Sequence, residues 1–162
     1  MFGQRGATTE SYRVPALSLN NLKPSLILID LGTNDLVAGL EPLIVAEKIF
    51  SLARHLENSY KAVVGVCSVL YRADHLVQSV QTFEQNVHVI NSHLRLMASK
   101  EDKIFFHMHK GFWETEEQGK KLKMSVQVWS HDLVHPNNQI GRAKYKNSIR
   151  NAISAALHYL KN

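Results

Sequence analysis

One apolar run with a polar end constrains the fold of this chain more than any other stretch. Residues 26–31 are Leu-Ile-Leu-Ile-Asp-Leu, and the turn-forming residues Gly32-Thr33-Asn34-Asp35 follow at once. A short, almost continuous apolar run is typical of a strand that is buried on both faces, as in a parallel sheet covered by helices. We therefore expect such a strand here, with the polar residues at its carboxyl end.

The rest of the chain alternates between short apolar runs and apolar stripes at helical spacing. Strands are expected over 26–31, 62–70 and 104–108, and helices over 43–57, 77–99 and 138–160. Residues 109–131 show no regular pattern, and an asparagine at 137 or 138 is expected to cap the last helix. The expected buried stripe of that helix is Ile149, Ala152, Ile153, Ala156, Leu157 and Leu160.

Alternating strands and helices build parallel sheets with right-handed crossovers. The predicted fold class is therefore α/β, as a three-layer α/β/α arrangement around a parallel, flavodoxin-like sheet. The 162 residues suit a single domain spanning 1–162. Loops at the carboxyl ends of such strands are the usual place for catalytic groups.

Composition narrows the class of protein. Apolar residues make up 44% and charged residues 20% of the chain, as in a globular protein. No apolar run approaches the ~20 residues that span a bilayer, and the chain does not open on a basic residue run followed by an apolar one. We therefore expect no signal peptide and no membrane partner. The lone cysteine, Cys67, fits a reducing compartment, and we expect a cytoplasmic location. For the net charge of +5 we favour solvated basic faces over a nucleic-acid contact.

A second polar motif, Asp132-Leu133-Val134-His135-Pro136, precedes the last helix. On one tight loop, a carboxylate three residues before a histidine can reach an imidazole nitrogen. Ester hydrolysis by a serine needs a base, a group that orients the base and donors for the oxyanion. His135 is the candidate base, Asp132 the candidate orienting group and Asn34 a candidate oxyanion donor. The alternative interpretation is two ordinary turns, since turns use the same residue types.

Together these motifs resemble the SGNH (GDSL-type) hydrolases, which are α/β esterases. The segment Gly3-Gln4-Arg5-Gly6-Ala7-Thr8-Thr9 resembles that family's second block, whose glycine N–H helps to form the oxyanion hole. Gly6 is the closest match and Gly3 the alternative. The resemblance implies two-step hydrolysis of carboxylic esters, with small acyl groups such as acetyl, through an acyl-serine. It implies no cofactor.

The chain departs from the family's pattern at its start, where no strand followed by Gly-Asp-Ser occurs. We expect the nucleophilic serine and the first strand or strands to be missing. The alternative function is a non-catalytic module that binds a ligand or nucleic acid. The family's strand order, 2-1-3-4-5, would leave residues 26–31 as an open apolar edge, which invites self-association.

Histidine and cysteine side chains offer two further kinds of chemistry. We expect the side chains of His107 and His109 on opposite faces of their strand, and therefore no metal site. Cys67 lies in the middle of an apolar run, where a buried small side chain is a better interpretation than a nucleophile.

Overall fold

The parallel sheet is built around β2 (Val63–Cys67), whose five residues are all buried. The computed structural model describes residues 6–11, 22–71, 79–115, 122–124, 126–132 and 134–160. In this part of the chain, β2 pairs in parallel with β1 (Leu26–Ile29) and with β3 (Ile104–His107). The order β1-β2-β3 agrees with the strand order that the family resemblance implies, in which these three strands are contiguous.

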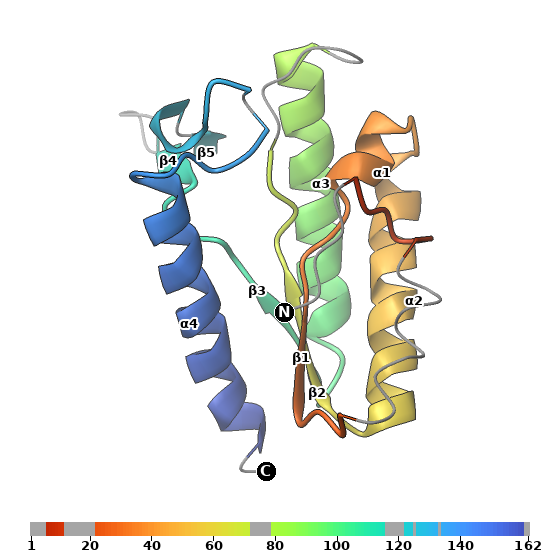
Figure 1. Ribbon diagram of the computed structural model, residues 1–162. Helices are drawn as coiled ribbons and strands as arrows, with labels where there is room; N and C mark the ends of the chain where they lie inside the picture. Colours follow the sequence, from red (N-terminus) through yellow and green to blue (C-terminus); the bar gives the residue numbers. More distant parts are fainter. Residues whose placement is uncertain are drawn as a thin grey trace.

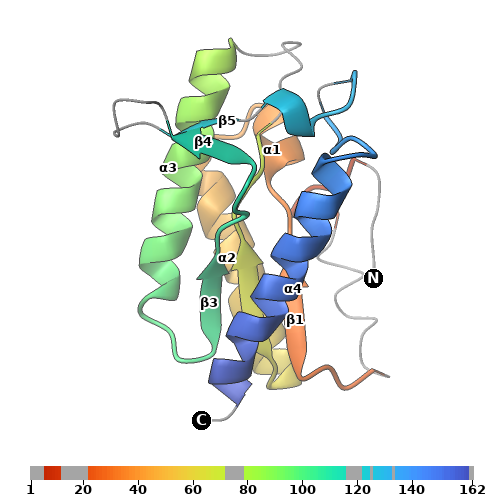
Figure 2. The ribbon, with the colours of Figure 1, turned by 90° about the vertical axis from the view of Figure 1, so that its left-hand side faces the viewer.

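Helices cover both faces of this sheet, so the expected three-layer α/β/α arrangement is confirmed (Figure 1). The helices are α1 (Thr33–Val37), α2 (Pro42–Tyr60), α3 (Val80–Ala98) and α4 (Gly141–Leu160). The helices α2 and α3 pack together on one face, and α4 crosses the other face alone (Figure 2). None of the helices in the described ranges combines the length and apolar character needed to cross a membrane.

The first strand is shorter and less buried than the sequence predicts. It ends at Ile29, and only this residue of the strand is buried, whereas Leu26, Ile27 and Leu28 are partly exposed. Burial on both faces was therefore the wrong expectation for most of β1. Within the described residues β1 pairs only with β2, so it lacks the second neighbour that shields a central strand.

The stretch 109–131 is more regular than the sequence predicts. It contains a two-stranded antiparallel hairpin of β4 (Trp113–Thr115) and β5 (Leu122–Met124), followed by the 3-10 helix η2 (Val126–Val128). Strands of three residues are too short to give a readable hydrophobic alternation. These two strands are defined by their pairing with each other and not by a pattern of apolar residues along the chain.

The buried face of α4 also differs from the predicted stripe. Ala152 and Ala156 are buried as expected, but Ile153, Leu157 and Leu160 are exposed. The buried positions of this helix are Gly141, Ser148, Ala152 and Ala156. These are small residues, which let the helix backbone approach the sheet closely. A prediction of the buried face from hydrophobicity alone therefore selects the larger apolar residues on the adjacent side of α4.

Candidate active site

The loop that carries Asp132 and His135 is closed by backbone pairing. Trp129 and Pro136 form an isolated antiparallel bridge, and the Ser130 N–H donates to the His135 carbonyl oxygen at 2.8 Å. The Asn137 N–H donates to the Val128 carbonyl oxygen, also at 2.8 Å. Ser130 and His135 are therefore held together across the loop, and the base of the loop joins η2 to the start of α4.

Asn137 holds the base of this loop with its side chain. Its Oδ1 accepts hydrogen bonds from the N–H groups of Ile140 (2.8 Å) and Gly141 (2.9 Å), as a helix cap does. Its Nδ2 donates to the carbonyl oxygens of Gln127 (2.7 Å) and Trp129 (3.2 Å). Of the two asparagines predicted as caps, the structure selects Asn137.

The two residues predicted as base and orienting group are in direct contact. The Nδ1 of His135 lies 2.7 Å from Oδ2 of Asp132. The other oxygen, Oδ1, accepts from Ser130 Oγ at 2.5 Å and from the N–H groups of Val134 (2.9 Å) and His135 (3.0 Å). These hydrogen bonds, that of Ser130 first, hold the pKa of the Asp132 carboxyl well below its usual range. Asp132 is therefore an ionised acceptor at neutral pH.

This contact determines which ring nitrogen can act as a base. A carboxylate only accepts, so Nδ1 of His135 carries the proton and Nε2 of the neutral ring keeps its lone pair. The side chain of His135 is 56% exposed, so Nε2 is accessible from outside. Within the described residues no hydroxyl group forms a hydrogen bond with this ring.

The second predicted group, Asn34, lies in the first turn of α1. Gly32 precedes this helix with φ +116°, and an added Cβ there would lie 2.8 Å from both Ile49 and Val69. Only glycine combines that backbone with that close approach. The turn-forming residues thus begin a short helix, and Asn34 Nδ2 donates to the Ala7 carbonyl oxygen at 2.8 Å.

Asp35 joins Asn34 in holding the segment that contains Gly6. Its carboxylate accepts the Thr9 N–H at 3.1 Å and the Thr9 hydroxyl at 2.5 Å, and the Asp35 side chain is buried. The structure therefore places the predicted residues Gly6 and Asn34 in adjoining segments. Gly6 itself is exposed, and Gly3 lies outside the described residues.

The two predicted pairs come from different loops at the same end of the sheet. The start of α1 and the loop after η2 both lie at the carboxyl ends of the strands (Figures 1 and 2). This is the edge at which α/β proteins usually bind ligands. Hydrogen bonds hold Asn34 to Ala7 in the first of these segments and His135 to Asp132 in the second.

A buried polar network lies between the strand ends and α4, and sequence reasoning missed it. The Tyr145 hydroxyl donates to Asp30 Oδ2 at 2.5 Å, and His109 Nε2 lies 3.3 Å from the same oxygen. The Nε2 atom of His109 is close enough to Asp30 for an ion pair, but the geometry is not that of a hydrogen bond. Burial, and then the charge of Asp30, raise the pKa of Tyr145, so its phenol stays protonated. The one signal in the sequence was an aspartate inside an apolar run.

The network corrects the expectation for the two histidines of the third strand. The ring of His107 (Nε2, 3.0 Å) and the ring of His109 (Nδ1, 2.9 Å) both contact Ser148 Oγ, so they share one face. Residues two apart in a strand point the same way, and the expectation of opposite faces was wrong. Even so, no three potential metal ligands gather anywhere in the described part of the chain.

The environment of Cys67 fits its interpretation as a small buried side chain. It is 1% exposed, and burial, followed by the charge of Asp30, raises the pKa of its thiol. A thiol with a raised pKa is a poor nucleophile at neutral pH.

Comparisons with known proteins support a relationship at the level of the fold. Neither protein-family models nor curated protein sequences gave a match. Among solved structures, a GDSL-like lipase from Bacteroides thetaiotaomicron superposes with a TM-score of 0.73 at 25% identity, over 93% of this chain and 73% of that chain. A candidate acylhydrolase from Bacteroides fragilis gives 0.75 at 22% identity, over 94% and 72%. The psychrotrophic esterase EstA from Pseudoalteromonas gives 0.65 at 15% identity, over 94% and 74%. This chain therefore has the α/β fold of the GDSL-like esterases and acylhydrolases, an SGNH hydrolase-like fold.

Proposed function

We propose that this chain supplies the acid–base and oxyanion groups of a carboxylic-ester hydrolase, and that the nucleophilic serine comes from outside it. The observation that carries the proposal is the contact between Nδ1 of His135 and Asp132 in a side chain that is otherwise exposed. Asn34 and the Gly6 N–H are the proposed oxyanion donors.

The proposed reaction has two steps. The serine hydroxyl oxygen attacks the ester carbonyl carbon while Nε2 of His135 takes the hydroxyl proton. The resulting imidazolium then gives this proton to the alcohol, which leaves. Water then attacks the acyl-serine by the same proton transfers and releases the acid. Asp132 keeps the ring in the required tautomer and stabilises the imidazolium. Small acyl esters such as acetyl esters are the proposed substrates.

The test compares two proteins in turnover of p-nitrophenyl acetate. One is the chain as it stands, and the other carries a designed apolar strand followed by Gly-Asp-Ser, joined ahead of residue 1. We expect serine-dependent turnover, and serine labelling by a fluorophosphonate, only in the second. In that protein His135→Ala should reduce turnover by about 10²–10⁴-fold, the usual contribution of a general base.

His131→Ala is the matched control, because His131 is an exposed histidine of the same loop with no resolved bond to Asp132. It should leave turnover unchanged. Labelling of a serine in the chain as it stands would show that the nucleophile lies within it. Equal turnover of the His135→Ala protein and its parent would remove His135 from the reaction.

A further inference from the structure

The outer side of β3 presents unpaired backbone groups. The Val64 N–H donates to the Lys103 carbonyl and the Ser68 N–H donates to the His107 carbonyl, so the odd-numbered residues of β3 bond to β2. In a parallel ladder the alternate residues direct their N–H and C=O groups the other way. Those of Ile104 and Phe106 therefore face outward, where no strand in the described ranges pairs with them.

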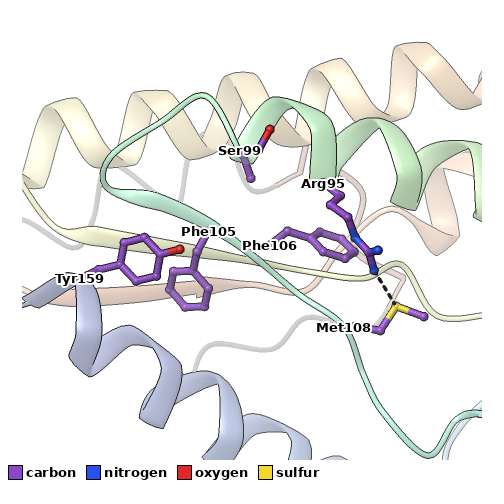
Figure 3. Close-up of a pocket in the computed structure, with 7 residues that line it drawn as sticks. Arg95, Ser99, Phe105, Phe106, Met108 and Tyr159 are labelled. Carbon is purple, nitrogen blue, oxygen red and sulfur yellow. Dashed lines mark hydrogen bonds between the residues drawn. The ribbon is translucent and has the colours of Figure 1, made fainter.

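A groove of about 350 Å³ lies along this edge, between α3 and α4. Its main lining side chains, which Figure 3 labels, are Arg95, Ser99, Phe105, Phe106, Met108 and Tyr159. Phe105 packs with the cluster under α4, whereas Phe106 packs against the core on the α3 side. The groove thus spans the sheet edge and has one wall on each face.

The two walls differ in chemistry. On the α4 side the ring of Tyr159 stacks on Phe105, with centroids 5.1 Å apart and planes 19° apart, which makes a flat apolar surface. On the α3 side the Arg95 guanidinium lies 5.3 Å from the centre of the Phe106 ring and 4.0 Å from the Met108 sulfur. A strand added at this edge would place alternate side chains on these two walls.

Arg95 is exposed and forms no ion pair within the described residues. The phenyl ring and the thioether leave most of its N–H donors unused. In the loop that follows α3, Lys100 and Lys103 are exposed. Glu101 of this loop is already paired with Arg54, so Asp102 is the one free carboxylate among these residues. Arg95 is therefore the one charged side chain among the residues that line the groove, and it is complementary to a carboxylate.

We propose that the outer edge of β3 binds an extended acidic peptide segment of another protein. The segment adds to the sheet as a strand through the N–H and C=O groups of Ile104 and Phe106. One of its carboxylates pairs with Arg95, and an apolar side chain of the opposite parity lies on Tyr159.

A second copy of this chain fits the edge less well. Two β3 strands related by a two-fold axis would bring the two α3 faces together, and with them two Arg95 side chains. Like charges at the same site disfavour that pairing. The charge of the groove therefore selects an acidic partner over the chain itself.

The probe is a blocked, fluorescein-labelled hexapeptide, Thr-Val-Glu-Val-Thr-Val, titrated against the intact chain by fluorescence anisotropy. Arg95→Gln should weaken binding by about fivefold, as should Gln in place of Glu in the peptide. Arg142→Gln, which removes an exposed arginine at the other end of α4, is the matched control and should leave binding unchanged. Circular dichroism checks that each variant is folded.

Two N-methylated peptides test the backbone pairing, each methylated on one of the two alternate sets of amides. The peptide methylated on the amides that face β3 should lose binding, and the peptide methylated on the other set should keep it. In a separate measurement, the Phe106 amide should exchange more slowly when the parent peptide is bound. Equal binding by both methylated peptides, or no effect of Arg95→Gln, would overturn the proposal. So would a sedimenting dimer in which the Phe106 amide is protected without peptide, because a second copy would then occupy the edge.

Discussion

The carboxylate of Asp132 is held by more partners than an exposed aspartate usually has. Four hydrogen bonds reach its two oxygens: those from Ser130, Val134 and both the backbone and the ring of His135. All come from residues within three positions of Asp132, so the loop can form this arrangement locally. The orientation of the His135 ring therefore depends on the turn more than on distant packing.

His107 gives a pH dependence that belongs to one residue. Burial, and next the neighbouring His109, lower its pKa from the ordinary value of 6.5. As the pH falls, the unfolded chain therefore binds a proton at this histidine before the folded chain does. The contribution of His107 to stability is present above about pH 6.5 and is lost as the pH falls toward its folded-state pKa. We expect the free energy of unfolding, measured in urea, to decrease from pH 7 to pH 5.

His107→Gln should flatten this decrease, because glutamine keeps a polar atom near Ser148 without titrating. His55→Asn, at an exposed position of α2, is the control and should retain the parent's slope. Parallel curves for His107→Gln and the parent would assign the pH dependence to other groups.

At the scale of the elements, the start of α4 positions the loop of Asp132 and His135. A Cβ added at Gly141 would lie 2.1 Å from the Val128 carbonyl oxygen and 2.9 Å from Pro136 Cα. Both contacts are with backbone, so the loop would have to shift. We expect Gly141→Ala to lower the free energy of unfolding by about 1–3 kcal/mol, as overpacking does. It should also change the NMR resonances of the His135 ring.

Ala143→Gly is the matched control for this prediction. Ala143 is exposed in the first turn of α4, and glycine there should cost about 1 kcal/mol through helix propensity alone. The His135 resonances should stay where they are. If both variants leave those resonances unchanged, the contact of Gly141 with the loop does not control the site.

At the scale of the whole molecule, β1 leaves one side of the sheet unpaired within the described residues. The Val63 N–H donates to the Ser25 carbonyl oxygen, so the N–H and C=O groups of Leu26 and Leu28 face away from β2. No strand in the described residues covers that side, and the strand carries no charge. We expect the chain to self-associate through this edge at micromolar concentration, in sedimentation and in slowed amide exchange at Leu28.

Leu26→Lys should reduce this association, because a lysine on an edge strand discourages pairing. Leu22→Lys, at an exposed leucine just before the strand, should not. A single monomer boundary across the concentration series would show that the outer side of β1 is already covered.

The sequence by itself determined what depends on short-range spacing. The alternation of strands and helices and the contact between Asp132 and His135 follow from patterns within one element or one loop. The strand order was expected from the family resemblance, not from local spacing. Element ends were less well predicted, as for β1, which ends two residues early. A pattern of apolar residues indicates that a strand exists but not where its last hydrogen bond lies.

Only the tertiary structure decided the contacts between distant residues. Tyr145 and Asp30 are 115 positions apart, and Thr9 and Asp35 are 26 apart. Nothing in local spacing predicts either pair, because each depends on how α4 or the first segment packs on the strand ends. The same holds for the buried face of α4, where close approach to the sheet favours small side chains over the larger apolar residues beside them.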